Sequence, residues 1–232
     1  MKNIKKTGYN LLALKTALDN VNPENASVHI STSNSKLGHI ASFNLLPVLT
    51  CSATACKTCA VEGCYAVKNA LCHGYDMSKN NALRAWAENT YIAFNNVHRL
   101  EVELDRFLSA YEFNNRFFRI HSSGDFFSTE YVEMWKRLAI KHPGIKFLAF
   151  TKQWDIIRRT SLSKIDNFSL VPSGWTGCEI PSDFTGEYKC AYCVERGETP
   201  PEGALECPGN CDGCGMCWSL QQIGKDVYFN KH

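Results

Sequence analysis

The sequence lacks three features that would point directly to a class of function. It has no excess of one charge, since 25 Lys and Arg residues stand against 23 Asp and Glu residues and leave a formal net charge of +2. It has no apolar run long enough to cross a membrane, and its basic first residues lead into an amphipathic segment rather than an apolar core. It contains no internal repeat and no low-complexity tract.

These absences narrow the choice of partner and compartment. Proteins that bind nucleic acid through its phosphates carry a basic field, so the balanced charge gives nucleic-acid binding little support. With no secretory or spanning signal, we expect a cytoplasmic protein with no membrane partner, inside the host cell if a phage encodes it. A chain of 232 residues with 44% hydrophobic content is long enough to bury a substantial core.

Cysteine is abundant but unevenly placed. Of the twelve cysteines, five lie within residues 51–72 and seven within residues 178–217, and the stretch between these groups has none. Disulfide frameworks of small secreted domains are spread through the chain, whereas clustered thiols in a reducing compartment favour metal ligation. The spacing therefore predicts metal sites rather than disulfides.

The first group forms a short loop. Cys51, Cys56, Cys59 and Cys64 are separated by four, two and four residues, among small side chains that cannot pack a core of their own. Metal binding would supply the missing folding free energy. Zinc sites usually take pairs two residues apart, and only one such pair is present, so we expect an iron–sulfur cluster. Three thiolates would leave one iron open for a small molecule, whereas four would suit electron transfer. Cys72 is interpreted as a buried thiol.

The second group lies in the tail. Its candidate ligands are Cys190, Cys193, Cys207, Cys211, Cys214 and Cys217. The pairs 190/193 and 214/217 approximate a zinc ribbon, while the run from 207 to 217 has the repeated two-residue gaps of ferredoxin loops. A second cluster and a zinc ion both remain open for this site.

Between the cysteine groups, helical and strand patterns alternate. The expected helices cover residues 9–19, 79–95, 98–113, 129–142 and 155–160, and the expected strands cover 28–33, 39–46, 116–121, 145–150, 168–171 and 227–229. Ser78 and Ser128 are the expected N-caps of two helices. This alternation predicts an α/β fold with a partial parallel (βα) barrel-like core. The core would span residues 1–176, and residues 177–232 would form a Cys-rich metal-binding appendage with a final strand.

Polar residues follow the expected strands. His121, Ser123, Asp125 and Lys152 are the candidate catalytic residues, and Ser122, Gly124 and Ser173 are candidate ligand-binding residues. Chemistry in parallel α/β folds collects at the carboxyl ends of strands, so these residues and the first cysteine loop should share one rim. The alternative is a tight turn with a hydrogen-bonded histidine, and a solvated lysine in a loop.

Four segments carry a resemblance to a known family. Cys64-Tyr65-Ala66, the segment from Arg119 to Ser128, the segment from Phe150 to Trp154 and the segment from Cys211 to Trp218 resemble the phage gene-product-eighty-eight family. The resemblance runs from about residue 31 to the end and implies a phage or prophage protein.

A second resemblance is one of order. A strand, a three-cysteine loop, barrel-like strands and a Cys-rich tail also follow one another in radical S-adenosylmethionine enzymes. The gap from Cys56 to Cys59 matches theirs, while the gap from Cys51 to Cys56 is one residue longer. This resemblance implies a 4Fe–4S cluster at the barrel mouth and S-adenosylmethionine as a cofactor.

We therefore expect an iron–sulfur protein that acts on a small-molecule ligand, with a radical reaction as the enzymatic version. An electron-transfer or redox-sensing protein with a redox partner is the first alternative. A zinc-stabilised module that binds nucleic acid or a host protein is the second, favoured by the ribbon-like spacing and by surface aromatics such as Trp218.

Overall fold

The computed structural model describes residues 2–52, 64–160, 162, 165–195 and 197–230. The chain has a mixed α/β fold built on an eight-stranded sheet with the order β1-β2-β3-β4-β5-β6-β8-β7. The strands are β1 (Ile30–Ser31), β2 (Ala41–Phe43), β3 (Phe117–Ile120), β4 (Lys146–Thr151), β5 (Phe168–Trp175), β6 (Ala191–Val194), β7 (Leu205–Glu206) and β8 (Val227–Asn230). β1 is antiparallel to β2, and the other pairings are parallel.

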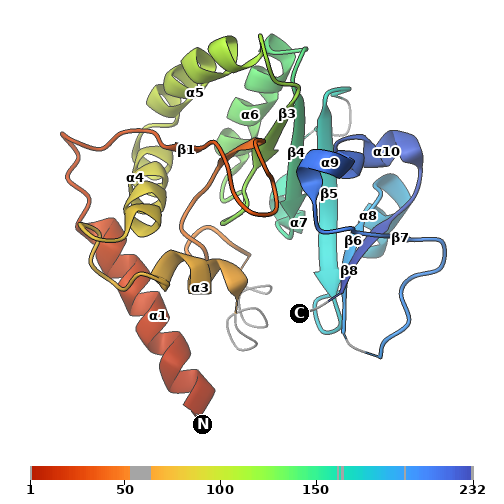
Figure 1. Cartoon of the computed structure of the whole chain (residues 1–232), viewed down its shortest axis with the longest axis horizontal. Helices are drawn as coiled ribbons and strands as arrows, with labels where there is room; N and C mark the ends of the chain where they lie inside the picture. Colours follow the sequence, from red (N-terminus) through yellow and green to blue (C-terminus); the bar gives the residue numbers. More distant parts are fainter. Residues whose placement is uncertain (1, 53–63, 161, 163–164, 196, 231–232) are drawn as a thin grey trace.

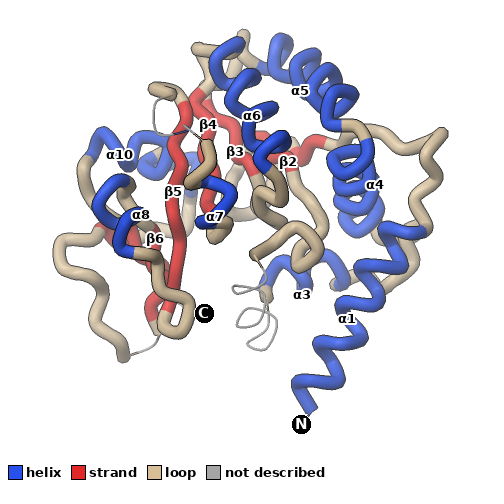
Figure 2. The backbone as a smooth tube through the Cα atoms, turned by 180° about the vertical axis from the view of Figure 1, so that it is seen from behind, coloured by secondary structure: helices blue, strands red, loops and turns tan. Residues whose placement is uncertain are grey.

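Helices lie on both sides of this sheet. They are α1 (Lys2–Asp19), α3 (Tyr65–Leu71), α4 (Asn81–Asn95), α5 (Val97–Tyr111), α6 (Thr129–Lys141), α7 (Trp154–Ile157), α8 (Ser182–Glu187), α9 (Cys211–Cys214), the 3-10 helix η2 (Met216–Ser219) and α10 (Leu220–Ile223). Figures 1 and 2 show α4, α5 and α6 along one side of the strands and α9 and α10 along the other.

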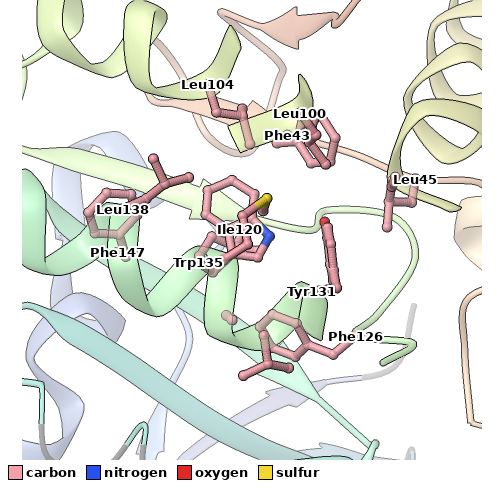
Figure 3. Close-up of a cluster of buried hydrophobic side chains, with 14 of the residues drawn as sticks. Phe43, Leu45, Leu100, Leu104, Ile120, Phe126, Tyr131, Trp135, Leu138 and Phe147 are labelled. Atoms are coloured by element: carbon pink, nitrogen blue, oxygen red, sulfur yellow. The ribbon is translucent and has the colours of Figure 1, made fainter. Parts of the chain in front are cut away.

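The larger core lies between the sheet and the long helices. Trp135 of α6 is fully buried, and its ring lies 5.7 Å from that of Phe43, 5.9 Å from that of Phe118 and 6.4 Å from that of Phe147. These rings come from β2, β3 and β4, so a single helical side chain contacts three neighbouring strands. Figure 3 labels Trp135 together with Phe43 and Phe147. The alternation of β3 explains the contact, since every second residue of a strand faces the same side.

The helix starts follow side-chain capping. Asn80 accepts a hydrogen bond from the backbone N–H of Leu83 at the start of α4, and Ser128 accepts one from Tyr131 at the start of α6. The predicted cap at Ser128 is confirmed. The predicted cap at Ser78 is wrong, because the Ser78 hydroxyl donates to the Asp76 carboxylate instead.

The predicted elements between residues 79 and 171 are present, with ends shifted by a few residues. The largest shift is at β5, which was expected to end at Val171 and continues to Trp175. Residues 173–175 of β5 pair with residues 191–193 of β6, a strand that was not predicted. This pairing provides the hydrogen bonds that keep the chain extended beyond Pro172.

The tail continues the sheet instead of standing apart from it. β6 and β8 extend the parallel order beyond β5, and a second core cluster joins Trp218, Leu220 and Val227 of the tail to Leu148 and Val171 of β4 and β5. Trp218 is 3% exposed, so its prediction as a surface aromatic is wrong. The Trp218 ring packs against Phe117 of β3, which is far from it in the sequence.

The α/β class and the mostly parallel sheet are confirmed. The barrel-like core and the domain boundary between residues 176 and 177 stay predictions. Pairings among the described strands leave β1 and β7 at the two ends of the order. Within the described residues, no helix has the length and apolar character needed to span a membrane.

Candidate functional site

The predicted polar residues at the strand ends lie around one pocket. It holds about 650 Å³ of space, part of which is open to solvent. The predicted residues that line it are Cys51, Cys64, His121, Ser122, Ser123, Gly124, Asp125 and Lys152. Ser173 lies next to the pocket, where its Oγ accepts a hydrogen bond from Lys152 Nζ at 2.8 Å. Parallel strands that end at the same edge bring these residues together.

Asn44 positions the turn that follows β3. Its Oδ1 accepts hydrogen bonds from the backbone N–H groups of Ser122 at 2.7 Å and Ser123 at 3.2 Å. The Ser123 hydroxyl donates to the Leu45 carbonyl at 2.9 Å, and the Leu45 N–H donates to the Ser123 carbonyl. The Ser123 hydroxyl is therefore part of the link between the β2 and β3 ends, which fits a structural role better than a catalytic one.

Gly124 allows two segments to meet closely. Its φ is +86°, and a Cβ at this position would lie 2.8 Å from Leu45 Cβ and 2.8 Å from Thr50 Oγ1. Both the left-handed backbone and the lack of space require glycine. The pocket wall therefore depends on this residue for its shape.

Asp125 joins the β3 turn to the end of β4. Its carboxylate accepts hydrogen bonds from Thr151 Oγ1 at 2.7 Å, from its neighbour Phe126 N at 2.8 Å and from Lys152 N at 2.8 Å. Burial raises the pKa of this carboxyl, while the Lys152 charge and the hydrogen bonds act in the opposite direction. With three donors already bound, the carboxylate holds the backbone of Lys152 in place.

His121 is buried in an uncommon backbone conformation. Its φ is +62°, and its Nε2 lies 2.8 Å from Tyr131 Oη. Burial, and to a smaller extent the nearby Arg119 charge, lowers the pKa of His121 to about 3, so the ring is neutral near pH 7. Its Nδ1 is enclosed without a hydrogen-bond partner among the described residues. A residue outside the preferred φ range beside a pocket is a candidate functional residue.

Two pocket residues with polar side chains, Arg119 and Tyr65, were missing from the predicted set. Arg119 of β3 lines the pocket, and Tyr65 at the start of α3 donates a hydrogen bond from Oη to the Ser122 carbonyl at 2.6 Å. The signal for Arg119 is a charged residue inside the otherwise apolar strand Phe117–Ile120. Tyr65 carries no such signal, because its role depends on where α3 lies.

The first cysteine group is described in part. Cys51 and Cys64 both line the pocket, and Cys56 and Cys59 lie outside the described residues. Burial raises the pKa of the Cys64 thiol. The nearby Cys51 thiol raises this pKa further, and the Lys152 charge lowers it. Cys72 was predicted to be a buried thiol, and this prediction is wrong, because the side chain is exposed. Cys72 is the C-cap residue of α3.

Four tail cysteines meet at a second pocket. Cys207, Cys211, Cys214 and Cys217 all line a hollow that holds about 240 Å³ of space, part of it open. Burial raises the pKa of Cys217 to about 12, with Arg119 acting in the opposite direction and the other three thiols adding to the rise. Each of these thiols is therefore close enough to affect Cys217 electrostatically.

The tail backbone is anchored around these thiols. Asn210 caps α9 by accepting from the Gly213 N–H, and the Cys211 N–H donates to the Lys36 carbonyl at 2.9 Å. The Ser169 hydroxyl donates to the Cys217 carbonyl at 2.7 Å. Gly215 ends α9 with φ +61°, and a Cβ added there would lie 3.3 Å from the Phe117 ring. Residues from β3, β5 and the loop before β2 thus position the tail cysteines.

The remaining tail cysteines lie elsewhere. Cys190 is fully buried before β6, and burial raises the pKa of its thiol to about 12. Cys193 is half-buried on β6, and neither thiol lines the second pocket. The structure therefore brings together four of the six predicted tail ligands. It separates the ribbon-like pair from them.

The described thiols are not arranged around a single ion. No three His, Cys, Asp or Glu side chains within the described ranges are grouped so that they could hold one metal ion. A tetrahedral zinc site needs its sulfurs about 2.3 Å from the metal, and so close to one another.

Comparison with known proteins places the chain among phage proteins. The family model described as Gene product 88 matches residues 11–220. The "Gene 88 protein" of Mycobacterium phage L5 is 36% identical over 120 residues, which cover 44% of this chain and 50% of that protein. The chain thus spans about half the length of this curated relative. No solved structure matches the chain. These matches give no support to the resemblance to radical S-adenosylmethionine enzymes.

Proposed function

The chain belongs to the Gene product 88 family, and from this premise we propose that it is an iron–sulfur protein with two cysteine-lined centres. The observation that carries the proposal is the convergence of Cys207, Cys211, Cys214 and Cys217 on one hollow of the tail. Thiolates from a short loop are the usual ligands of iron–sulfur clusters.

The tail centre has the surroundings that such a cluster needs. The hollow is bounded in part by apolar residues, including Met216 and Trp218. The backbone around the cysteines is held by hydrogen bonds from other parts of the fold, and such outer contacts orient ligands before the metal binds. A cluster of four irons is larger than one ion, so its thiolates stand further apart than those of a zinc site.

The second centre is proposed for the first cysteine group. Cys51 and Cys64 line the strand-end pocket, and they bracket Cys56 and Cys59 in the sequence. We keep all four as candidate ligands. Three thiolates would leave one iron open to a small molecule in the pocket, beside Lys152, whereas four would make this centre a carrier of electrons.

The enzymatic version of the proposal uses the pocket. In a partial barrel that opens at the strand ends, the ligand would be bound next to the first centre, with S-adenosylmethionine as the candidate. The pocket beside Cys51 and Cys64 favours this version. Electron transfer or redox sensing remains the alternative, and a zinc-stabilised tail is the alternative for the second metal.

Metal and sulfide analysis of anaerobically purified protein tests the proposal. We expect iron and acid-labile sulfide in both centres, and we expect Cys211→Ser/Cys214→Ser and Cys51→Ser/Cys64→Ser each to lose about half of both. Cys72→Ser is the matched control, because this exposed thiol is not a candidate ligand of either centre. Zinc without sulfide in the unmodified protein would contradict the proposal.

Single variants separate the two uses of the first centre. If one iron is open to a ligand, one cysteine of the four should be dispensable for holding iron. If all four bind, each of the single variants Cys51→Ser, Cys56→Ser, Cys59→Ser and Cys64→Ser should lose this centre. Iron content of the four variants, measured in a background without the tail centre, decides between them.

A further inference from the structure

Two cationic side chains reach the strand-end pocket and form no ion pair within the described part of the chain. Arg99, Arg137 and Arg158 all form ion pairs with carboxylates, at distances of 2.6–2.9 Å. Arg119 and Lys152 line the pocket, and neither forms an ion pair with any described residue. Both side chains are half-buried. A cation that is partly removed from water without an ion-pair partner loses hydration free energy, so its position at the pocket calls for an explanation.

Arg119 keeps most of its donors available. Its Nε donates to the His121 carbonyl at 3.2 Å, and its guanidinium carbon lies 4.1 Å from the centre of the Phe150 ring. The terminal nitrogens donate to no described residue, yet they are not among the fully enclosed side-chain atoms left without partners. They therefore have access to open space, which the pocket supplies. Stacked on Phe150, the guanidinium has a fixed plane with its fork free.

Lys152 is held in a similar way. Its Nζ donates to Ser173 Oγ at 2.8 Å and lies 4.9 Å from the centre of the Trp175 ring. The neighbouring Asp125 carboxylate is already bound by three donors, among them the Lys152 backbone N–H. An ammonium group on a ligand would find no free carboxylate there, whereas an anion would find two cations.

The rest of the wall is largely apolar. Pro47, Val48, Ala66 and Phe150 line the pocket beside its polar groups. Pockets for small molecules combine an apolar lining with a few polar groups that fix orientation. The wall thus suits a ligand with an apolar body and a negative group at one end.

We propose that the pocket binds a small organic oxyanion, whose carboxylate or phosphate oxygens lie between Arg119 and Lys152 and whose body contacts the apolar wall. An arginine fork and a lysine charge are the groups that proteins use for both kinds of oxyanion. The role of this ligand beside the first cysteine centre rests on the proposed function. The binding itself depends on the two cations alone.

One other use of Arg119 competes with this proposal. Burial lowers the pKa of Arg119, while the charges of Tyr65, Cys217 and Cys211 raise it. The guanidinium is thus within electrostatic reach of the tail thiols, and it would serve there as the counter-charge of the tail centre. The two uses predict different effects of removing the charge.

Calorimetric titration of the full chain tests the proposal, in the metal-free and in the iron-loaded form. The probes are benzoate, phenyl phosphate and benzyl alcohol, which share a ring and differ in the charged group. We expect the anions to bind and the alcohol not to bind. Arg119→Gln and Lys152→Gln should each weaken anion binding by roughly tenfold to a hundredfold, as expected for a charge-assisted hydrogen bond. The stronger of the two anions identifies the oxyanion class.

Matched variants control for folding and for general charge. Arg137→Gln and Lys146→Gln remove cations that lie outside the pocket, the latter at the opposite end of β4 from Lys152. They should leave anion binding unchanged. Arg119→Lys keeps the charge without the fork and should bind more tightly than Arg119→Gln. If Arg119→Gln is unstable, Arg119→Lys and Lys152→Gln can each be compared with the unmodified chain, and both should bind the anions more weakly.

The outcomes separate the two proposals. Anion binding that does not depend on Arg119 or Lys152, or no binding at all, overturns the oxyanion site even if both centres load with iron. A changed absorption spectrum of the tail centre in Arg119→Gln with unchanged anion binding also overturns it and assigns Arg119 to that centre. If the protein takes up no iron but anion binding depends on Arg119 and Lys152, the oxyanion site is supported and the iron–sulfur proposal is contradicted.

Discussion

The two cysteine-bearing regions are held in place by different forces. In the tail, α9 and η2 pack on the sheet through apolar contacts, with Trp218 5.1 Å from Phe117 between ring centres. At the strand-end pocket, Asn44, Gly124 and Asp125 fix the walls through hydrogen bonds and close backbone contact. The tail should therefore respond most to loss of apolar volume. The pocket should respond most to changes in backbone conformation and in ionisation.

The largest expected effect tests whether the tail belongs to the same folding unit as the sheet. Trp218→Ala removes a buried ring and the hydrogen bond from its Nε1 to the Phe118 carbonyl. We expect the free energy of unfolding to fall by about 3–5 kcal/mol in a single transition, measured by urea denaturation. Phe113→Ala is the control, because this ring is 87% exposed and its loss should change little. A separate tail transition at unchanged core stability would show instead that the tail unfolds by itself.

A somewhat smaller effect is expected at the pocket wall. Gly124→Ala adds a Cβ 2.8 Å from Leu45 and Thr50 in a left-handed backbone, and we expect a loss of about 2–5 kcal/mol. Gly74→Ala is the matched control, since Gly74 has φ +88° and no atom within 4 Å of the added Cβ. It should lose only the backbone term of about 1–2 kcal/mol. Equal losses in the two variants would mean that the close contact does not matter.

The smallest effect concerns ionisation at the pocket. The pKa of His121 is lowered from 6.5 to about 3 in the folded chain, so the unfolded chain binds more protons between these values. The free energy of unfolding should therefore fall as the pH falls from 6.5 toward 3, with a His121 contribution of roughly 1.5–2 kcal/mol between pH 6.5 and pH 5. His121→Asn tolerates the left-handed backbone and does not titrate, so its stability should depend less on pH by this amount.

His98→Asn is the control for this measurement, because His98 is exposed on α5. It should keep the pH dependence of the unmodified chain. If His121→Asn also keeps it, the tail and the pocket do not differ in their response to pH. The comparison between the two regions would then rest on packing alone.

Much of the fold was predictable from local patterns. The spacing of apolar residues located α4, α5 and α6, and the Ser128 cap followed from one hydrogen bond within four residues. The Ser78 cap failed because Asp76 competes for the same hydroxyl. β6 was missed, and with it the last part of β5, because the pairing of residues 173–175 with residues 191–193 joins segments that are separated in the sequence.

The candidate site divides along the same line. The order of strands and polar turns predicted that His121, Asp125 and Lys152 would share a rim, and they line one pocket. The spacing of the tail cysteines allowed two sets of ligands. Only the fold showed which set is together. Cys207 lines the same hollow as Cys211, Cys214 and Cys217, whereas Cys190 is buried before β6.

By itself, the sequence determined the element types, the clustering of thiols and the turn that carries Gly124, because these depend on residues close together in the chain. Only the tertiary structure decided that Trp218 is buried, that Tyr65 contacts Ser122 and that Arg119 lines the pocket beside Lys152. Each of these depends on which distant segments meet. Burial and hydrogen-bond partners are properties of that meeting, and no local pattern encodes them.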